Sequence, residues 1–380
     1  MQTVSPIPQL TKALLNPKPF PAKLLYLFSD LLPEDQRELA KLWPSIPLER
    51  RRNLLKDLVD LNDSDFVYNF DAVGWTALDD QVTDVVCAGI DLLFTTDDKH
   101  LIPIFSRLLR DQNRDELVRA AAANALGPYV YYGELEELQE EKLHEIEEVL
   151  LAAYAQDPSE HVRRRALESL GYSSREEVAP MIRKAVDHPD PKWVESGLFA
   201  IGRSGETQYE EYIMEDLDDP DQEVRLQAIH AAGALGVSAA RAPLLKLISP
   251  KADVEFRKEA IWALSQIGGE GVEEAFTRLQ AFSEDDEELN LLEEALDTLN
   301  FVNDAGLFEM LDIEEEDLEK LVHGQTDGLD ETDDEIGHPD YEEWEKYLDE
   351  DGEFEDEDED DEDELYFEDE EDEDSIDEDR

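Results

Sequence analysis

The sequence has one cysteine, no long apolar run and few basic residues. Cys87 is the only cysteine among 380 residues, so no disulfide can form within the chain, which fits a reducing compartment. No stretch approaches the ~20 consecutive apolar residues of a transmembrane helix, and the first residues lack the basic segment and apolar run of a signal peptide. We therefore expect a soluble, cytoplasmic protein that does not bind a membrane.

The scarcity of basic residues makes the chain strongly acidic. It holds 33 Lys and Arg against 100 Asp and Glu, a formal net charge of -67. Residues 284–380 alone hold 50 acidic and 3 basic residues. Phosphates would be repelled by such a surface, so we expect no direct nucleic-acid partner. The acidic segment 325–380 cannot bury enough apolar surface to offset its ordering entropy, and we expect it to be disordered.

Motifs that carry catalysis are also missing. The chain has no P-loop, no zinc-ligand spacing and no Gly-x-Ser-x-Gly elbow, and its seven His residues show no pair at ligand spacing. The glycine-rich segments "GRSGE" (202–206) and "GGEG" (268–271) are expected to be turns. The sequence therefore predicts no catalytic residue, no cofactor-binding residue, no metal site and no enzyme.

What the sequence does contain is a repeat. "DPSEHVRRRALESLG" (157–171) and "DPDQEVRLQAIHAAG" (219–233) are close copies of each other. Four residues after a recurring anchor stands a small residue, and eight after it stands an apolar one, which is helical spacing. The anchors, 31–44 residues apart, are Val85, Val118, Val162, Trp193, Val224 and Phe256. Such a period is the signature of a solenoid.

Two further features recur in each unit. Nine residues after four anchors stands a glycine, which suits a helix end or a close helix crossing; these are Gly127, Gly171, Gly202 and Gly233. A second amphipathic segment precedes three anchors, with Pro103, Pro180 or Pro243 inside it. We expect these prolines to kink their helices, so that each unit is helix, kink, turn and helix. Stacked units bury the faces that one unit alone leaves exposed.

The Asp-Pro turn followed by Val-Arg, Ala and Leu-Gly resembles a HEAT repeat, and more narrowly the short HEAT-like repeats of phycobilisome (PBS) lyases. The resemblance covers residues 64–302 and implies an all-α fold, a HEAT-like α-solenoid in which helical hairpins form a right-handed superhelix. In HEAT repeats an Arg after the anchor ties neighbouring turns together through an Asp. Here that Arg is Arg119, Arg163, Arg225 or Arg257. Asp157 and Asp219 stand five residues before their anchors, where this contact requires an acid. Val86 and Val194 replace the Arg, so we expect the ladder of Arg–Asp contacts between turns to be interrupted there.

The pattern divides the chain into four segments. Residues 1–63 are expected to be an N-terminal helical cap with amphipathic helices at 33–43 and 47–61. Residues 64–302 are expected to be an array of about six HEAT-like units, interrupted by an insertion at 129–151 that we interpret as an extended helix and loop. Residues 303–324 follow as a terminal helix, and 325–380 as the disordered acidic tail.

A candidate partner site lies on the second helices, which line the concave face in HEAT arrays. Six residues after the anchor, opposite the core side of the helix, stand Phe199, His230 and Trp262. Exposed large apolar groups in a strip mark binding sites. We predict a peptide-binding strip with Arg164 and Lys258 at its edges. The alternative is a small rotation of the helices that packs these residues into the core.

The tail offers a second candidate, because Tyr341 and Trp344 stand among acidic residues and suit a basic, partly apolar partner. A tail that only solubilises, or that occupies the protein's own groove, remains an alternative. Together these features predict a non-enzymatic protein-binding scaffold or adaptor whose partner is not identified. Two alternatives are an acidic chaperone or nucleic-acid mimic for basic proteins, and an enzyme like the phycobilin lyases and isomerases. HEAT-like deoxyhypusine hydroxylases bind iron through repeated His-Glu pairs, but this chain has one such pair, His144–Glu145.

Overall fold

The computed structural model describes residues 5–64, 67–249, 251–283 and 285–310, with side chains described up to residue 300. Within these ranges the chain forms α-helices and short 3₁₀-helices and no β-strand. The N-terminal elements are α1 (Ile7–Leu14), a 3₁₀-helix (Ala22–Phe28), α2 (Pro33–Leu42) and α3 (Leu48–Ser64). The amphipathic helices predicted at 33–43 and 47–61 are thereby confirmed.

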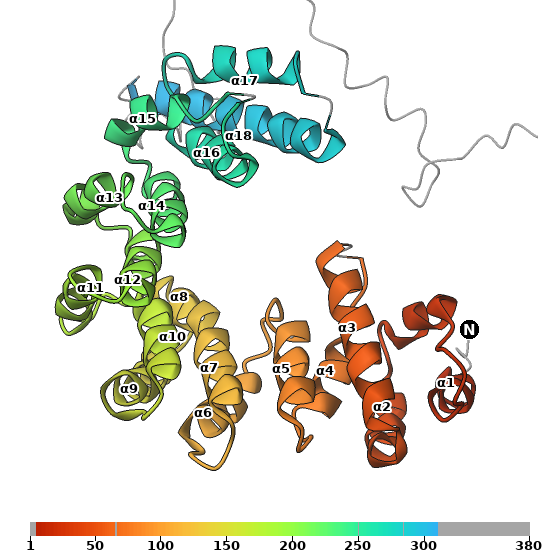
Figure 1. Ribbon diagram of the computed structural model, residues 1–380. Coiled ribbons are helices and arrows are strands. Elements are labelled where there is room, and N and C mark those ends of the chain that lie inside the picture. Colours follow the sequence, from red (N-terminus) through yellow and green to blue (C-terminus); the bar gives the residue numbers. More distant parts are fainter. Residues whose placement is uncertain (1–4, 65–66, 250, 284, 311–380) are drawn as a thin grey trace, which may run out of the picture. The chain divides into compact units, whose positions relative to one another are not determined.

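Helical pairs fill the rest of the described chain. The first helices of the pairs are α4 (Asp71–Ala77), α6 (Leu101–Arg110), α9 (Glu140–Gln156), α11 (Val178–Val186), α13 (Glu210–Asp216), α15 (Arg241–Leu245) and α17 (Val272–Gln280). The second helices are α5 (Thr83–Leu92), α7 (Glu116–Ala125), α10 (Glu160–Leu170), α12 (Pro191–Ser204), α14 (Gln222–Ala234), α16 (Val254–Ile267) and α18 (Asp286–Met310). Each second helix packs on its own first helix and on the second helix of the next pair (Figure 1). The all-α solenoid predicted from the repeat is confirmed.

Local sequence signals explain where the second helices begin. An Asp three residues before the anchor caps four of them, because its carboxylate accepts the N–H two residues further on. The capping oxygens of Asp115, Asp190, Asp221 and Asp253 lie 2.9–3.1 Å from those nitrogens. The segment 268–271 is a turn as predicted, and Gly271 precedes α17 with φ 86°. The prediction for 202–206 is wrong in part, because residues 202–204 are the last turn of α12 and the helix ends only at Gly205, with φ 66°.

The predicted proline kinks are wrong. Pro103, Pro180 and Pro243 are each the third residue of their helices, α6, α11 and α15. The first turn of a helix has N–H groups without intrahelical partners, so a proline there removes no hydrogen bond and forces no bend. The prolines therefore mark where the first helices start.

The insertion also differs from its prediction. Its first part is an additional short helix, α8 (Gly127–Glu134), directly after α7. The remainder belongs to α9, which packs on α10 as the ordinary first helix of that pair. The long spacing between Val118 and Val162 is therefore a normal unit plus one extra helix. The sequence pattern alone did not show that the insertion ends before α9, because α9, with 17 residues, is longer than the other first helices.

The buried side chains form two clusters. The larger extends from Leu78 to Leu299 through the second helices and includes the anchors Val118, Val162 and Val224. The smaller joins the N-terminal helices to α4 and α5 through residues such as Phe70 and Val85. The N-terminal helices thus cover the first pair, as a cap does.

The C-terminal predictions are tested only in part. Helix α18 runs through the expected boundary between residues 302 and 303 without interruption. The remainder of the predicted terminal helix, the acidic tail and its Tyr341 and Trp344 lie outside the described residues. The three boundaries between the four predicted segments stay predictions. Among the described residues no helix is long and apolar enough to span a membrane.

Candidate functional site

The predicted arginine ladder is present between α7 and the turn before α10. Arg119 donates from Nε and Nη2 to the two carboxylate oxygens of Asp157, at 2.9 and 3.0 Å, and both residues are 5% exposed. Burial alone would raise the pKa of Asp157. Hydrogen bonds from Arg119, the Ser159 N–H and Gln112 outweigh that effect and hold the pKa below its usual value. Asp157 is therefore the acid that ties two turns together, as predicted.

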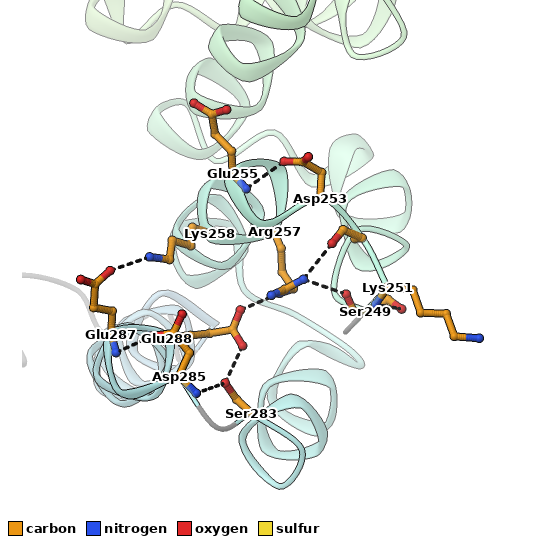
Figure 2. Close-up of polar contacts among 11 residues, drawn as sticks. Ser249, Lys251, Asp253, Glu255, Arg257, Lys258, Ser283, Asp285, Glu287 and Glu288 are labelled. Atoms are coloured by element: carbon orange, nitrogen blue, oxygen red, sulfur yellow. Dashed lines mark hydrogen bonds and ion pairs between the residues drawn. The ribbon is translucent and has the colours of Figure 1, made fainter.

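A second rung lies at the last described pairs (Figure 2). Arg257 on α16 donates from Nε to Glu288 on α18 at 2.6 Å. Its Nη1 also reaches the Ala252 carbonyl at 2.9 Å and the Ser249 carbonyl at 3.3 Å. Here the acid comes from the helix itself rather than from an Asp-Pro turn, so the repeat pattern did not predict it.

The other two ladder arginines have no acid from the next pair. Arg163 lies over the Trp193 ring, 5.8 Å from its centroid, and Arg225 lies over the Phe256 ring at 4.9 Å. Both rings are the anchors of the following units. Five residues before these anchors stand His188 and Lys251 instead of Asp. An aromatic anchor therefore substitutes for the missing carboxylate, a signal that the sequence carries.

Asp219 does not play the role predicted for it. Its carboxylate accepts the Asp221 N–H at 2.7 Å, and its carbonyl accepts from Arg225 at 2.6 Å. The preceding unit offers no arginine, because Val194 occupies that position. The interruption predicted at Val194 is confirmed, and it is the reason that Asp219 lacks an arginine partner. Arg51 of α3 forms an ion pair with Asp80, which extends the ladder into the cap.

The predicted strip begins on α12. Phe199 is half-buried, and the guanidinium of Arg203 lies over its ring, 4.3 Å from the centroid. The same guanidinium lies 4.8 Å from the ring centroid of Tyr172, which follows α10. Arg203 also donates to the Glu168 carbonyl at 2.9 Å, which fixes it between the two rings. Glu168 on α10 also stands six residues after its anchor, Val162; its side chain is buried and accepts a hydrogen bond from Ser196 at 2.7 Å.

The strip continues on the next two second helices. The rings of His230 on α14 and Trp262 on α16 are stacked, with centroids 4.3 Å apart and planes 6° apart. Nδ1 of His230 lies 2.8 Å from the Glu259 carboxylate, and the His230 side chain remains 41% exposed. Trp262 is half-buried against the main core cluster. The structure thus brings His230 and Trp262 into direct contact, whereas the ring contact of Phe199 is with Arg203.

The two edge residues are held by neighbouring helices. Arg164 donates to the Lys192 carbonyl at 3.2 Å and to Ser196 Oγ at 3.3 Å, which links α10 to α12. Lys258 donates to Glu287 at 2.9 Å, which links α16 to α18 (Figure 2). All five predicted residues of the array are half-buried. They are therefore less exposed than an open binding strip requires and more exposed than side chains rotated into the core would be. Their role in partner binding stays a prediction.

Sequence analysis missed Tyr172, Arg203 and Glu259. Tyr172 and Arg203 each stand ten residues after an anchor, and on a helix that position shares a face with position six. Extending the wheel by one turn would have found both. Among the described residues no group of three or more His, Cys, Asp or Glu is placed to hold a metal ion. His144 is exposed on α9, with Nε2 3.9 Å from Glu148.

Comparisons with known proteins identify the repeat. The family model for HEAT repeats matches residues 210–300. No curated protein is detectably similar in sequence. Among solved structures, the chain is similar to human deoxyhypusine hydroxylase (18% identity over 70% of this chain and 96% of that chain, TM-score 0.32). It is also similar to a designed armadillo repeat protein (21%, 52% and 99%, TM-score 0.33) and to importin beta (11%, 77% and 46%, TM-score 0.38).

Proposed function

We propose that this HEAT-repeat protein is a non-enzymatic, cytoplasmic scaffold that binds a protein partner through the second helices of its array. The binding surface is the second-helix strip, which we define as Phe199, Arg203, His230 and Trp262. Arg164 and Lys258 lie at its edges. The observation that carries the proposal is the stacked pair of His230 and Trp262, because it offers a partly exposed aromatic surface that spans two repeats.

Two properties of the strip support partner binding. Aromatic and arginine side chains dominate the binding energy of protein interfaces, and the strip consists of three rings and a guanidinium. The side chains are also held before any partner arrives. Glu259 fixes His230, and the Glu168 carbonyl fixes Arg203. Binding by side chains that are already ordered loses less conformational entropy, so more of the contact energy appears as affinity.

The test is the double variant Phe199→Ala, His230→Ala in the full chain. Affinity capture from the native cell identifies a protein that binds the unmodified chain, and its dissociation constant is then measured with purified proteins. We expect the double variant to bind at least about 30-fold more weakly, because the loss of even one hot-spot side chain costs about 2 kcal/mol. We avoid Trp262→Ala, since this ring packs against the core and truncation would also leave a cavity.

Phe282→Ala is the matched control. Phe282 is also a surface phenylalanine, 71% exposed, but it follows α17 and lies outside the strip. The control should bind the partner as the unmodified chain does. Equal affinity of the double variant and the unmodified chain would overturn the proposal. So would a loss of binding that is matched by a large fall in melting temperature, because the strip would then be part of the core.

A second candidate function is supported by charge. Residues 284–380 carry 50 acidic and 3 basic residues, which favours binding of a basic protein by an acidic chaperone. This candidate places the working part in the predicted tail, including Tyr341 and Trp344, rather than on the second helices. The two candidates differ in their dependence on salt, because screening weakens contacts between exposed charges more than apolar contacts.

A further inference from the structure

A second surface feature lies apart from the strip, where the turns of two neighbouring pairs meet. The end of α9, the start of α10, the end of α11 and the start of α12 surround a hollow of about 480 Å³. We call it the Arg163 pocket. Its polar lining residues are Tyr154, Glu160, Arg163, Lys184, His188 and Trp193.

The pocket is the place where the arginine ladder lacks its acid. Arg119 is neutralised by Asp157, five residues before the next anchor. For Arg163 the corresponding position is His188, which lines the pocket. The Nε atom of Arg163 is buried and has no hydrogen-bond partner in the described part of the chain. That atom is closed to solvent, but the Arg163 side chain as a whole is 31% exposed, and among the described residues only its Nη2 is paired with an acid, Glu160. An oxyanion in the pocket can therefore bind the exposed part of the guanidinium and complete the rung that the sequence leaves open.

Other donors around the pocket are unused as well. In the described residues neither the Lys184 ammonium, the Tyr154 hydroxyl nor the Trp193 Nε1–H has a hydrogen-bond partner. Burial raises the pKa of Tyr154, so its hydroxyl stays protonated at neutral pH and can donate.

His188 adds one more donor. Its Nδ1 accepts the Asp190 N–H at 3.1 Å. The neutral imidazole therefore carries its proton on Nε2, which makes that atom a donor. The rings of His188 and Trp193 lie 5.7 Å apart, so both line the same wall of the pocket.

The charge of the pocket is unusual for this chain. Residues 1–283 hold 50 acidic and 30 basic residues, yet the pocket contains two permanent cations and one carboxylate, Glu160. That carboxylate is exposed and lies 2.9 Å from Nη2 of Arg163. Lys184 has no acid within ion-pair distance among the described residues. The excess positive charge selects an anion.

The number of donors indicates which anion. Arg163, Lys184, His188, Tyr154 and Trp193 are five separate donor groups, and a carboxylate has about four lone-pair sites on two oxygens. A phosphate monoester has three terminal oxygens and up to two negative charges, and arginine and lysine are its usual partners. We propose that the Arg163 pocket binds a phosphate monoester carried by a side chain of a partner protein. The phosphate chemistry follows from the pocket; the protein carrier rests on the proposed scaffold function.

The equivalent place two units further along the array provides a comparison. Arg225 lines a hollow of about 430 Å³ between α13 and α16. There its Nη1 is already used by the carbonyls of Asp219 and Pro220, at 2.6 and 3.2 Å, and Asp218 and Asp253 line the hollow. Arg225 therefore needs no external anion, and Arg225→Gln is a matched control for Arg163.

The experiment titrates the full chain with phenyl phosphate in an isothermal calorimeter at physiological salt, with benzoate as the carboxylate of similar shape. We expect saturable binding of phenyl phosphate and at least about tenfold weaker binding of benzoate, because benzoate leaves at least one charge-assisted hydrogen bond of the pocket unmade. Lys184→Glu should weaken the binding of phenyl phosphate by about tenfold or more, by the same loss of a charge-assisted bond. Arg163→Gln should do the same, and Arg225→Gln should leave it unchanged.

Lys184→Glu is the decisive variant. Arg163 stacks on a buried anchor, so its substitution can also disturb folding, whereas Lys184 is exposed and has no partner to lose. The proposal is overturned if phenyl phosphate does not saturate the unmodified chain, if Lys184→Glu binds it equally well, or if benzoate binds as tightly. The strip variant Phe199→Ala, His230→Ala should bind phenyl phosphate normally. Failure of the strip and failure of the pocket are therefore observed separately.

Discussion

At the scale of single residues, the ladder predicts that Asp157 contributes far more to the free energy of unfolding than Asp219, its counterpart in the repeat. Asp157 accepts two hydrogen bonds from buried Arg119, whereas the Asp219 carboxylate accepts the Asp221 N–H and pairs with no described arginine. Asp157→Asn leaves a buried arginine without its charge partner, which costs about 3–5 kcal/mol. Asp219→Asn, the matched control, should cost about 1 kcal/mol or less. Urea unfolding at neutral pH measures both free energies.

The same residue gives a pH dependence whose sign is fixed. The pKa of Asp157 is lower in the folded chain than in the unfolded one. Its contribution to stability is therefore complete above the unfolded pKa of about 3.9 and is lost as the pH falls through the folded value. The difference in unfolding free energy between the unmodified chain and Asp157→Asn should be constant above about pH 5 and shrink below about pH 4. A difference that grows on acidification would contradict the assignment.

Residue-level prediction from the sequence worked where the repeat is regular. Asp157 and the interruption at Val194 follow from their places in the repeat. The contact between His230 and Trp262 does not, because the helical wheel gives the face of each residue but not the separation of neighbouring helices. The π-contacts of Arg163 and Arg225 were missed for another reason. The predicted ladder requires an acid five residues before the next anchor, whereas Arg163 and Arg225 contact the aromatic anchors Trp193 and Phe256 themselves.

At the scale of the helix, two glycines at the same repeat position have different surroundings. A Cβ on Gly171, which ends α10, would lie 2.7 Å from the Ala200 carbonyl oxygen and 2.8 Å from its Cα. A Cβ on Gly202, inside α12, would meet nothing closer than the Ala234 Cβ at 3.4 Å. The position serves a close helix crossing in the first case and not in the second.

Alanine at each position should therefore have opposite effects. Gly171→Ala forces α10 and α12 apart and should destabilise by about 1–3 kcal/mol, as overpacking does. Gly202→Ala should be neutral or stabilising by up to about 1 kcal/mol, because alanine is the better helix former. Thermal unfolding followed by circular dichroism compares them. Equal shifts of the two melting temperatures would show that the crossing at Gly171 relaxes freely.

Helix-level prediction was limited by what one sequence shows. The second helices were placed correctly because anchor, small residue and apolar residue recur at helical spacing. The prolines were placed correctly but interpreted wrongly, since Pro at the third position of a helix and Pro in its middle look alike until the start is known. Helices α8 and α9 were predicted as one segment because the chain between them, residues 135–139 (LEELQ), holds neither a proline nor a glycine to mark a break.

At the scale of the whole molecule, the solenoid could be predicted from the sequence and is confirmed, whereas the partner sites on the strip and in the tail stay predictions. A repeat fixes the fold because each unit packs only on its neighbours, so six recurring anchors were enough. A partner site depends on which side chains of the repeat depart from the pattern. Phe199, His230 and Trp262 differ from the repeat because they place a ring on the face of the helix opposite the core. The Arg163 pocket differs because His188 stands where the repeat would have an acid.

The distribution of charge along the whole chain leads to the last prediction. Residues 325–380 carry 34 acidic and 2 basic residues, so a chain that ends at Gly324 loses much of the negative charge and keeps the described helices. A Lys-rich peptide serves as the basic probe. Full-length protein should bind it at ~50 mM salt and lose at least about tenfold in affinity by ~300 mM, because the screening length falls below ~10 Å. The shortened chain should bind it weakly at both salt concentrations.

Binding of the scaffold partner should depend little on salt or on residues 325–380. If the shortened chain binds the peptide as well as the full chain does, the acidic chaperone function does not lie in the tail. If the scaffold partner is lost with the tail instead, the second-helix strip is not the surface that holds it.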